Sequence, residues 1–362
     1  MRAFVTGGSG FIGKRVIAKL LERGWQVTAL VRSRQAVEAM RAAGVQPAWG
    51  DITARGSLAD GMRGADAVFH LAAWYQLGSS DWRRAEEINV EGTRNVLEVA
   101  WELKIPRIIY TSTVAVYGDT GGLRPDERYI PEAPRLLTEY DRTKHAAHYQ
   151  VALPLIQQGA PVIIVMPGAV YGPGDPSLLG EMMRSFYRGL FPVLPGPELT
   201  LTYAHVDDIA EGHLLAAEKG RVGESYHLTG DELRLGQAVK LWAQASRRPA
   251  PRLEIPGRWV APLAPVMGKI GELVPLPAVL SRDAVAITTA CYTADSSKAR
   301  TELGWQTRPL AEGLQETFDR IAASTAPLRL LPQRIERRQA AALALGAGVG
   351  MLAAWLVWKR RR

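Results

Sequence analysis

Tyr140 and Lys144 form the residue pair in this sequence that is best suited to moving a proton. Four residues apart on a helix, their side chains share one face. A free phenol has a pKa of about 10 and cannot easily exchange its proton at neutral pH, whereas a nearby ammonium group favours the phenolate and lowers that pKa. The spacing therefore predicts a tyrosine that acts as general acid or base with help from a lysine.

Hydroxyl groups upstream of this pair add to the prediction. Thr111, Ser112 and Thr113 stand at the end of a predicted strand, 107–111. Ligands of open α/β sheets bind at the carboxyl ends of the strands. We therefore expect these hydroxyl groups and the tyrosine–lysine pair to meet at that edge.

A glycine-rich stretch, 6–13, follows the first predicted strand and opens the first predicted helix. Gly7 allows a tight turn, Gly10 lets the backbone approach a pyrophosphate, and Gly13 lets helix and strand pack closely. The N-terminus of the helix then faces the phosphates. Glycine motifs are weak signals alone, but this position directly after an N-terminal strand predicts a dinucleotide site.

The residues after the second predicted strand, 27–31, indicate which dinucleotide binds. An acidic residue here would accept a hydrogen bond from a ribose 2′-hydroxyl. The sequence has Arg32 and Arg34 instead, and guanidinium groups bind phosphates well. NADP is therefore the expected cofactor, with NAD as the alternative if both arginines are only surface residues.

Short apolar runs alternate with helical patterns through the first half of the chain. The predicted strands lie at 3–5, 27–31, 67–71, 107–111 and 162–166, and the predicted helices at 13–23, 58–63, 88–103 and, later, 235–246. This alternation implies a parallel sheet with helices on both faces, wound doubly by right-handed crossovers. The expected fold class is α/β: a doubly wound parallel Rossmann-type sheet, a smaller interleaved C-terminal substrate-binding domain, and a C-terminal apolar helix.

The texture of the sequence changes after Pro167, where proline and glycine cluster. We therefore predict a dinucleotide-binding domain at 1–166 to which 204–222 return, a substrate-binding portion at 167–203 and 223–330, a basic linker at 331–339, a transmembrane helix at 340–358 and a basic tail at 359–362.

Composition narrows the function classes. The chain has 47% hydrophobic and 22% charged residues, as expected for a globular core. Its one cysteine, Cys291, cannot form an intramolecular disulfide, which fits a reducing compartment. The net charge of +8 lies partly in Lys359–Arg362, and no zinc-finger spacing or aromatic-studded basic stretch is present. We expect neither a nucleic-acid partner nor a metal site.

The segment Ala340–Trp358 is an uncharged run of 19 residues. As a helix it would nearly span a hydrocarbon core of about 30 Å, and it lacks the polar face of a soluble helix. We expect it to anchor a cytoplasmic catalytic domain to a membrane; a packed C-terminal helix is the alternative. Gly346 and Gly350 have the spacing of a helix-pairing motif, so a homodimer is a further option.

Further motifs resemble those of the extended short-chain dehydrogenase/reductase superfamily, the NAD-dependent epimerase/dehydratase family. They are Gly50–Asp51, His70–Ala73, Asn89–Thr93, Val170–Asp175, His205–Asp208, Asp295–Ala299 and Leu303–Trp305, and the resemblance covers roughly residues 1–318. Two features of the sequence most resemble the dihydroflavonol-reductase and 3β-hydroxysteroid-dehydrogenase-like branch of this family. One is Met166, where sugar-nucleotide epimerases often carry arginine, and the other is the pair of aromatic residues Trp74 and Tyr75.

The resemblance implies a catalytic set. Thr113, where the family usually has serine, would hold the substrate oxygen, and Tyr140 would exchange the proton. Lys144 would tune Tyr140 and bind the nicotinamide ribose, while Asn89 would support a proton-relay water. The histidines are expected to be structural: His70 in the core, and His145 and His148 as polar positions on a helix.

The resemblance also implies binding residues. Those for the cofactor are Gly7, Gly10, Phe11, Ile12, Gly13, Arg32, Asp51, Ile52, Leu71, Ala72, Ala73, Tyr140, Lys144 and Pro167. Those for the substrate are Trp74, Tyr75, Thr113 and Tyr171.

The expected function is hydride transfer between nicotinamide and a carbonyl or secondary alcohol of an apolar substrate of flavonoid, steroid or terpenoid type. A sugar-nucleotide epimerase or dehydratase with tightly bound NAD is the alternative. A non-catalytic dinucleotide sensor at a membrane is a third hypothesis, and the intact set of Thr113, Tyr140 and Lys144 argues against it.

Overall fold

The computed structural model describes residues 1–76, 81–274, 276 and 278–325. These residues form two compact units. The first contains Met1–Gly172, Leu201–Glu232 and Cys291–Leu310, and the second contains Pro173–Thr200, Leu233–Ala290 and the described residues from Ala311 on. The predicted linker, transmembrane helix and basic tail at 331–362 lie outside the described residues.

A parallel sheet is the frame of the first unit, as predicted; it has seven strands, two of which, β3 and β10, the sequence pattern does not predict. Its strand order is β10-β6-β5-β4-β1-β2-β3. The bounds are β1 Arg2–Thr6, β2 Gln26–Val31, β3 Gln46–Trp49, β4 Ala67–His70, β5 Ile108–Thr111, β6 Val162–Pro167 and β10 Ser225–Leu228. After β3 the chain crosses back to place β4 beside β1, so later strands are added on the opposite side of β1 from β2 and β3, and the strand order reverses between β1 and β4. Such a switch point opens a crevice at the carboxyl ends of the strands.

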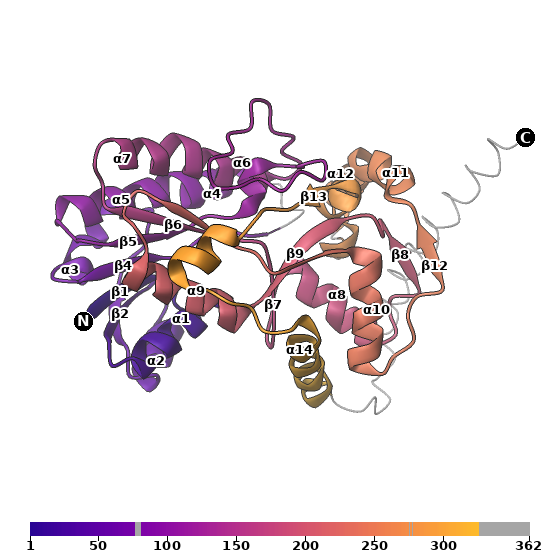
Figure 1. Ribbon diagram of the computed structural model, residues 1–362, viewed down its shortest axis with the longest axis horizontal. Helices are drawn as coiled ribbons and strands as arrows, with labels where there is room; N and C mark the ends of the chain where they lie inside the picture. The colour runs from indigo at the N-terminus through magenta and orange to yellow at the C-terminus, as the bar shows by residue number, and fades with distance from the viewer. Residues whose placement is uncertain (77–80, 275, 277, 326–362) are drawn as a thin grey trace, which may run out of the picture. The chain divides into compact units, whose positions relative to one another are not determined.

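Each face of this sheet buries its own apolar cluster, because side chains alternate along a strand. Ala3 and Val5 of β1 join the cluster on one face, whereas Phe4 joins the other. Figure 1 shows helices α1, α2 and α9 on one side of the strands and α3, α5 and α7 on the other. The helix bounds are α1 Phe11–Glu22, α2 Arg34–Ala42, α3 Ala59–Met62, α5 Gly92–Glu102, α7 Leu153–Gln157 and α9 Val206–Lys219.

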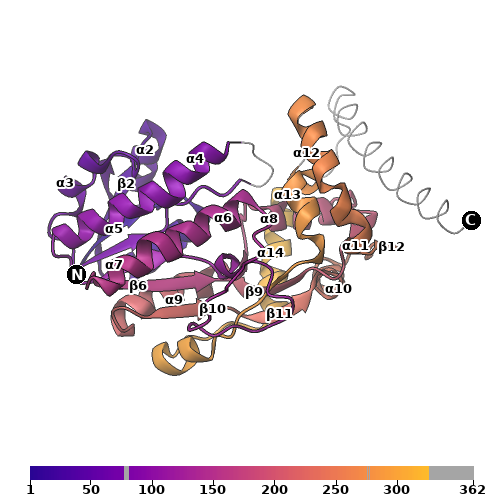
Figure 2. The ribbon, with the colours of Figure 1, turned by 90° about the horizontal axis from the view of Figure 1, so that it is seen from above.

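Two long helical segments contain π-helical turns that the sequence pattern does not predict. The helix predicted at 88–103 begins earlier, as α4 (Trp82–Glu86), and continues through a π turn at Glu87–Glu91 into α5. Likewise α6 (Glu139–Ala146) passes through a π turn at Ala147–Ala152 into α7. In Figure 2 the two segments run side by side. Such turns concentrate at functional sites, and these two contain Asn89 and His148.

The outer edge of the sheet, at β10, is protected by side chains. The Glu127 carboxylate accepts a hydrogen bond from the backbone N–H of His227 at 2.9 Å, and Lys298 Nζ donates to the Ser225 carbonyl oxygen at 2.9 Å. Exposed strand edges invite pairing with other chains, and charged side chains prevent it.

A smaller sheet has the order β11-β9-β13, with β7 beside β9. Its strands are β7 Ala169–Tyr171, β9 Thr200–His205, β11 Asp231–Arg234 and β13 Cys291–Tyr292. Most of these residues belong to the first unit.

The second unit is mainly helical around an aromatic core. The Phe186 ring lies 5.9 Å from the ring of Trp242 and 6.2 Å from that of Phe318, between centroids. Its elements are α8 Leu178–Tyr187, β8 Val193–Pro195, α10 Leu235–Ser246, β12 Leu253–Ile255, α11 Gly257–Val260, α12 Ala264–Leu273, α13 Arg282–Ala286 and α14 Leu310–Ser324. No helix within the described part of the chain has both the length and the hydropathy to cross a membrane.

Trp305 is a principal packing residue of the first unit. Its side chain is fully buried in the cluster beside α9, and its indole N–H donates to the Asp208 carbonyl oxygen at 2.7 Å. We expect Trp305→Ala to lower the free energy of unfolding by about 3–5 kcal/mol, because it removes a large buried side chain and leaves a cavity. Trp49→Ala is the control: Trp49 is 64% exposed, so its loss should change stability by less than about 0.5 kcal/mol. Equal destabilisation of both variants in urea titrations would contradict this account of the core.

Candidate active site

The glycine-rich turn between β1 and α1 has no room for side chains. Gly7 has a φ of +72°, and a Cβ there would lie 2.6 Å from the backbone nitrogen of Ala72. At Gly13 a Cβ would collide with the Gly7 carbonyl oxygen. Gly10 caps α1 without a side chain, which leaves the first N–H groups of that helix free of a side-chain acceptor. This cradle fits a pyrophosphate, whose oxygens such N–H groups bind.

Arg32 extends from the end of β2 toward solvent, with 66% of its side chain exposed. Its guanidinium lies 3.6 Å from the Asp51 carboxylate, so the structure brings these two predicted cofactor residues together. Burial alone would raise the pKa of Asp51. Hydrogen bonds from the Thr53 N–H and hydroxyl groups, together with Arg32, outweigh that effect and lower the pKa. Asp51 is therefore an anion that holds Arg32 near the end of β2.

The Thr113 side chain lies close enough to the Tyr140 phenol to lower its pKa, and its own hydroxyl donates to the Pro167 carbonyl oxygen at 3.4 Å. Thr113 follows β5 and caps a 3₁₀ turn by accepting the Ala115 N–H at 3.2 Å. Tyr140 lies in the first turn of α6, which a capping box of Thr138 and Asp141 fixes. Both hydroxyl groups are thus held by local backbone structure at the carboxyl edge of the sheet.

The pKa of Tyr140 differs from what its spacing to Lys144 suggests. Burial raises it above the ordinary phenol value, and the hydrogen bond with Thr113 lowers it only in part. The lysine has other partners: its Nζ donates to the Thr111 carbonyl oxygen at 2.8 Å and to the Tyr110 hydroxyl at 3.3 Å. The expected lowering by Lys144 is therefore absent from this structure, and Tyr140 holds its proton at neutral pH.

Lys144 is itself buried, with only 2% of its surface exposed. Removal of the ammonium from water lowers the pKa of Lys144 from 10.5 to about 7. A lysine whose pKa lies near the working pH is typical of functional sites.

Asn89 holds the backbone next to the catalytic helix. Its side-chain oxygen accepts the Trp74 N–H at 2.7 Å, and its amide group donates to the Trp74 carbonyl at 3.0 Å and to the Thr143 hydroxyl at 2.9 Å. The side chain thus links the segment after β4 to α6. A role in supporting a relay water stays a prediction.

The predicted substrate residues lie in different surroundings. The Tyr75 ring packs edge-on against the Tyr140 ring, with 4.7 Å between centroids, and is 46% exposed. Trp74 is partly buried against the core. Tyr171 is almost fully buried in β7 and packs on His205. The structure therefore brings Tyr75 to the catalytic tyrosine, while contact of Tyr171 with substrate stays a prediction.

Of two histidines next to the site, one lies where the sequence predicts and the other does not. His70 is a core histidine, as expected. His148 was expected on a polar helix surface, and this is wrong: it is buried, and its Nδ1 hydrogen-bonds the Ser112 hydroxyl at 2.9 Å. The reason is that the π turn brings this part of the helical segment against the end of β5. Burial lowers the pKa of both rings to about 3, so both are neutral.

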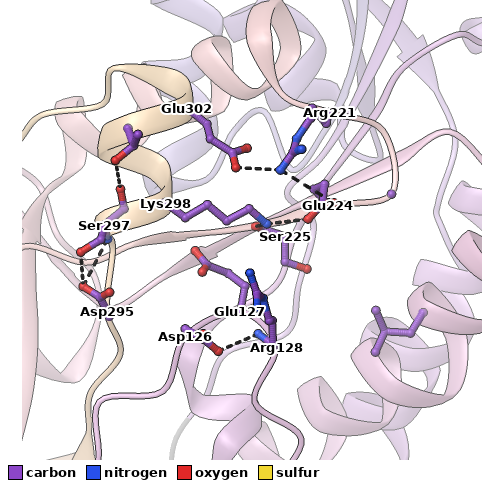
Figure 3. A pocket seen from close by; sticks show the side chains of 13 residues that line it. Asp126, Glu127, Arg128, Arg221, Glu224, Ser225, Asp295, Ser297, Lys298 and Glu302 are labelled. Atoms are coloured by element: carbon purple, nitrogen blue, oxygen red, sulfur yellow. Dashed lines mark hydrogen bonds and ion pairs between the residues drawn. The ribbon is translucent and has the colours of Figure 1, made fainter.

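A separate cavity of about 550 Å³ lies beside β10 (Figure 3). None of the predicted site residues lines it, and its charges pair with one another. Lys298 binds Glu224 at 2.6 Å, and Arg221 binds Glu302 at 2.7 Å. This arrangement fits a solvated, self-neutralised surface better than a reaction site.

The buried ammonium of Lys144 has a cost that depends on pH. Below about pH 7 the lysine is charged in both the folded and the unfolded state, and burial of that charge lowers the free energy of unfolding. Above pH 7 the folded protein holds a neutral lysine, and the loss of stability shrinks as pH rises. It disappears near the unfolded pKa of 10.5, where the unfolded chain is deprotonated too. We expect Lys144→Met to be more stable than the parent at pH 6, and the difference to shrink as pH rises to 10. Lys14→Met, at an exposed position of α1, is the control and should show no such trend. Urea titrations across pH measure this, and a constant difference would contradict the buried charge.

The chain matches a known protein family. The sequence model of the family described as NAD dependent epimerase/dehydratase matches residues 3–229. The crystal structure of gox2253 has a TM-score of 0.77 and 31% sequence identity, over 89% of this chain and 98% of that one.

Three named relatives match most of the sequence. A Synechocystis sp. protein named provisionally as a dihydroflavonol 4-reductase is 35% identical, over 86% of this chain and 92% of its own length. The 4-hydroxy-2-methyl-3-oxo-4-farnesyl-3,4-dihydroquinoline-1-oxide ketoreductase of Stigmatella aurantiaca is 33% identical, over 85% and 92%. Sterol demethylase protein B of Methylococcus capsulatus is 30% identical, over 84% and 93%.

Proposed function

Since this chain belongs to the NAD dependent epimerase/dehydratase family, we propose that it is a nicotinamide-dependent oxidoreductase that reduces a ketone on an apolar, ring-containing substrate. One observation carries this proposal: the Tyr140 phenol lies beside the Thr113 hydroxyl, which lowers its pKa, and the half-exposed Tyr75 ring packs edge-on against the Tyr140 ring, with 4.7 Å between centroids. A proton donor thus lies beside a hydroxyl that can hold a carbonyl oxygen and beneath an apolar surface.

The dinucleotide supplies the hydride, and the glycine cradle is what this chain offers to hold it. Gly7 and Gly13 leave space for a pyrophosphate, and the N-terminus of α1 offers N–H donors to it. We propose NADP as the cofactor, because Arg32 and Arg34 take the place of an acidic residue after β2.

Tyr140 acts as the general acid in this proposal. Its raised pKa keeps the proton on Oη at neutral pH, where it can pass to the oxygen of a ketone as that oxygen gains negative charge. Thr113 donates a second hydrogen bond to the same oxygen. In the described structure Lys144 bonds Thr111 and Tyr110 rather than Tyr140, so it would favour the tyrosinate left after the transfer only once its third N–H turns toward Tyr140.

The names of the relatives support an apolar substrate. One is a ketoreductase of a farnesylated quinoline oxide, and another is a sterol demethylase protein. Trp74 and Tyr75 supply aromatic surface of the kind that such rings contact.

Turnover of a hydrophobic ketone should require Tyr140. We expect the purified protein to oxidise NADPH with at least one member of a panel of steroid, flavonoid and prenylated ring ketones. Tyr140→Phe should lower kcat by about 10²- to 10⁴-fold, because only the proton-carrying oxygen is lost. Cofactor affinity should stay nearly intact, because the ring keeps its packing.

Tyr149→Phe is the matched control, since Tyr149 lies about three turns from the start of the same helical segment and its hydroxyl makes a long hydrogen bond, 3.5 Å, to the Tyr129 carbonyl oxygen. It should keep parental activity. Conversion of nucleotide sugars with retained NAD, and of no ketone in the panel, would refute the proposal and favour an epimerase or dehydratase.

Arg32 should decide between the two dinucleotides. We expect the parent protein to bind NADPH more tightly than NADH, and Arg32→Asp to reverse that order, because an acid repels a 2′-phosphate and accepts a hydrogen bond from a 2′-hydroxyl. Arg41→Asp, at the exposed end of α2, makes the same charge change and should leave the order intact. Fluorescence titrations measure both affinities; a parent that prefers NADH would rule out this role for Arg32.

We also propose, from the sequence of the C-terminal segment, that the protein is attached to a membrane. The uncharged run 340–358 would hold the enzyme at a membrane, where apolar substrates concentrate. We expect the full-length protein to sediment with membranes, and a chain that ends at Arg338 to be released and active. Full-length protein in the supernatant without detergent would contradict an anchor.

A further inference from the structure

The charge on Lys144 is buried without a carboxylate partner. Among the residues that the structure describes, no acidic group lies within ion-pair distance of its Nζ. A buried charge without compensation is costly, so other groups must stabilise it. Two acceptors are the Thr111 carbonyl and the Tyr110 hydroxyl, and the Tyr110 ring offers its face, with its centroid 4.8 Å from Nζ.

Tyr110 is the first member of a buried chain of hydrogen bonds. Its hydroxyl also lies beside the side chains of Thr93 and Ser112, which lower its pKa against the larger effect of burial. The Thr93 hydroxyl lies 3.1 Å from His70 Nε2, and His70 Nδ1 lies 2.7 Å from the Thr6 hydroxyl. Thr6 ends β1 and directly precedes Gly7. The chain therefore runs from the catalytic lysine, across the ends of β5, β4 and β1, to the glycine-rich turn.

The numbers of donors and acceptors on each group indicate which group donates each of these hydrogen bonds. An ammonium group only donates, so the Tyr110 oxygen accepts from Lys144 and keeps one proton to give. A neutral His70 has one N–H, so it can accept from Thr93 at Nε2 and donate to Thr6 from Nδ1. In this arrangement each dipole turns its negative end toward the ammonium.

We propose that Tyr110 is a positioning residue for the reaction: its hydroxyl and ring hold the Lys144 ammonium in place of a carboxylate, and the chain through Thr93 and His70 ties that position to the glycine-rich turn. The proposal rests on the function proposed for Tyr140 and Lys144. It assigns a role to a strand residue that no catalytic motif contains.

Neutral partners leave Lys144 able to donate a further hydrogen bond to a ligand or to Tyr140. A carboxylate would draw the ammonium into a closed pair, whereas the Thr111 carbonyl and the Tyr110 hydroxyl occupy two of its three N–H donors. The third donor is left for a ligand or for Tyr140.

The other titratable groups around Lys144 do not replace Tyr110. His70 and His148 feel its charge but are neutral, because burial lowers their pKa. Asp141, on the same helix, accepts hydrogen bonds from the Leu137 and Thr138 N–H groups and from Tyr292. Tyr140 is held by Thr113 and keeps its proton.

The test is a direct titration of Lys144 in the purified protein, by NMR of lysine labelled with carbon-13 at Cε. Its signal is the one absent from Lys144→Arg. We expect Tyr110→Phe to move the deprotonation midpoint of Lys144 by about one pH unit toward acid, since a hydrogen bond to the charged form is lost. A folded Tyr110→Phe with an unchanged midpoint would overturn the proposal.

Tyr117→Phe is the matched control. Tyr117 is a buried tyrosine of the same core, but its hydroxyl bonds His227 rather than Lys144. It should leave the Lys144 midpoint unchanged, and an equal shift would mean that any buried tyrosine loss perturbs the site, which also overturns the proposal. If Tyr110→Phe does not fold, Thr93→Val breaks the chain one step further on, and a smaller shift in the same direction is expected; no shift would count against the chain.

A second readout connects the titration to catalysis. The midpoint of the pH profile of kcat should move in Tyr110→Phe in the same direction as the NMR midpoint, whereas a merely structural role would lower kcat at every pH alike. If the parent protein reduces no ketone, the proposed function fails. The NMR titration still decides whether Tyr110 stabilises the ammonium.

Discussion

The burial of one ammonium group, that of Lys144, is the constraint on which the rest of the active site depends. The charge lies at the carboxyl edge of the sheet and has only neutral partners among the described residues. Such a charge is tolerated only where several polar groups are fixed around it. The end of β5 provides two of them, and the Thr138 cap fixes the start of α6 so that the helix brings the lysine to them. Asn89 and Thr143 then lock that helix to the segment that carries Trp74 and Tyr75.

Much of this architecture could be predicted from the sequence, because its signals are local. Buried strands read as short apolar runs, and Gly7 and Gly13 stand where a side chain would collide with backbone. Tyr140 and Lys144 share a helix, as their spacing predicts. The family resemblance is confirmed by the family match and by relatives above 30% identity.

The rest could not be predicted because it depends on which strands become neighbours. The contacts of His70 with Thr6 and Thr93, and of Tyr110 with Lys144, join residues far apart in sequence. The π turns depend on a single shifted hydrogen-bond register, so the placement of His148 was missed. Burial, rather than the neighbouring lysine, sets the pKa of Tyr140, and burial is a tertiary property. Tyr110 gave no signal of its own, because it reads as one more apolar strand position.

In the proposed reaction a hydride passes from the cofactor to a ketone while Tyr140 supplies the proton. The most direct measurement is the isotopic composition of the product after reaction with NADPH carrying deuterium at the reactive C4 position. We expect an alcohol with deuterium on its carbinol carbon, formed by the parent protein and lost in Tyr140→Phe. Conversion of substrate with all deuterium still on the cofactor would contradict the proposed reaction, since that result marks a cofactor that is recycled within the site.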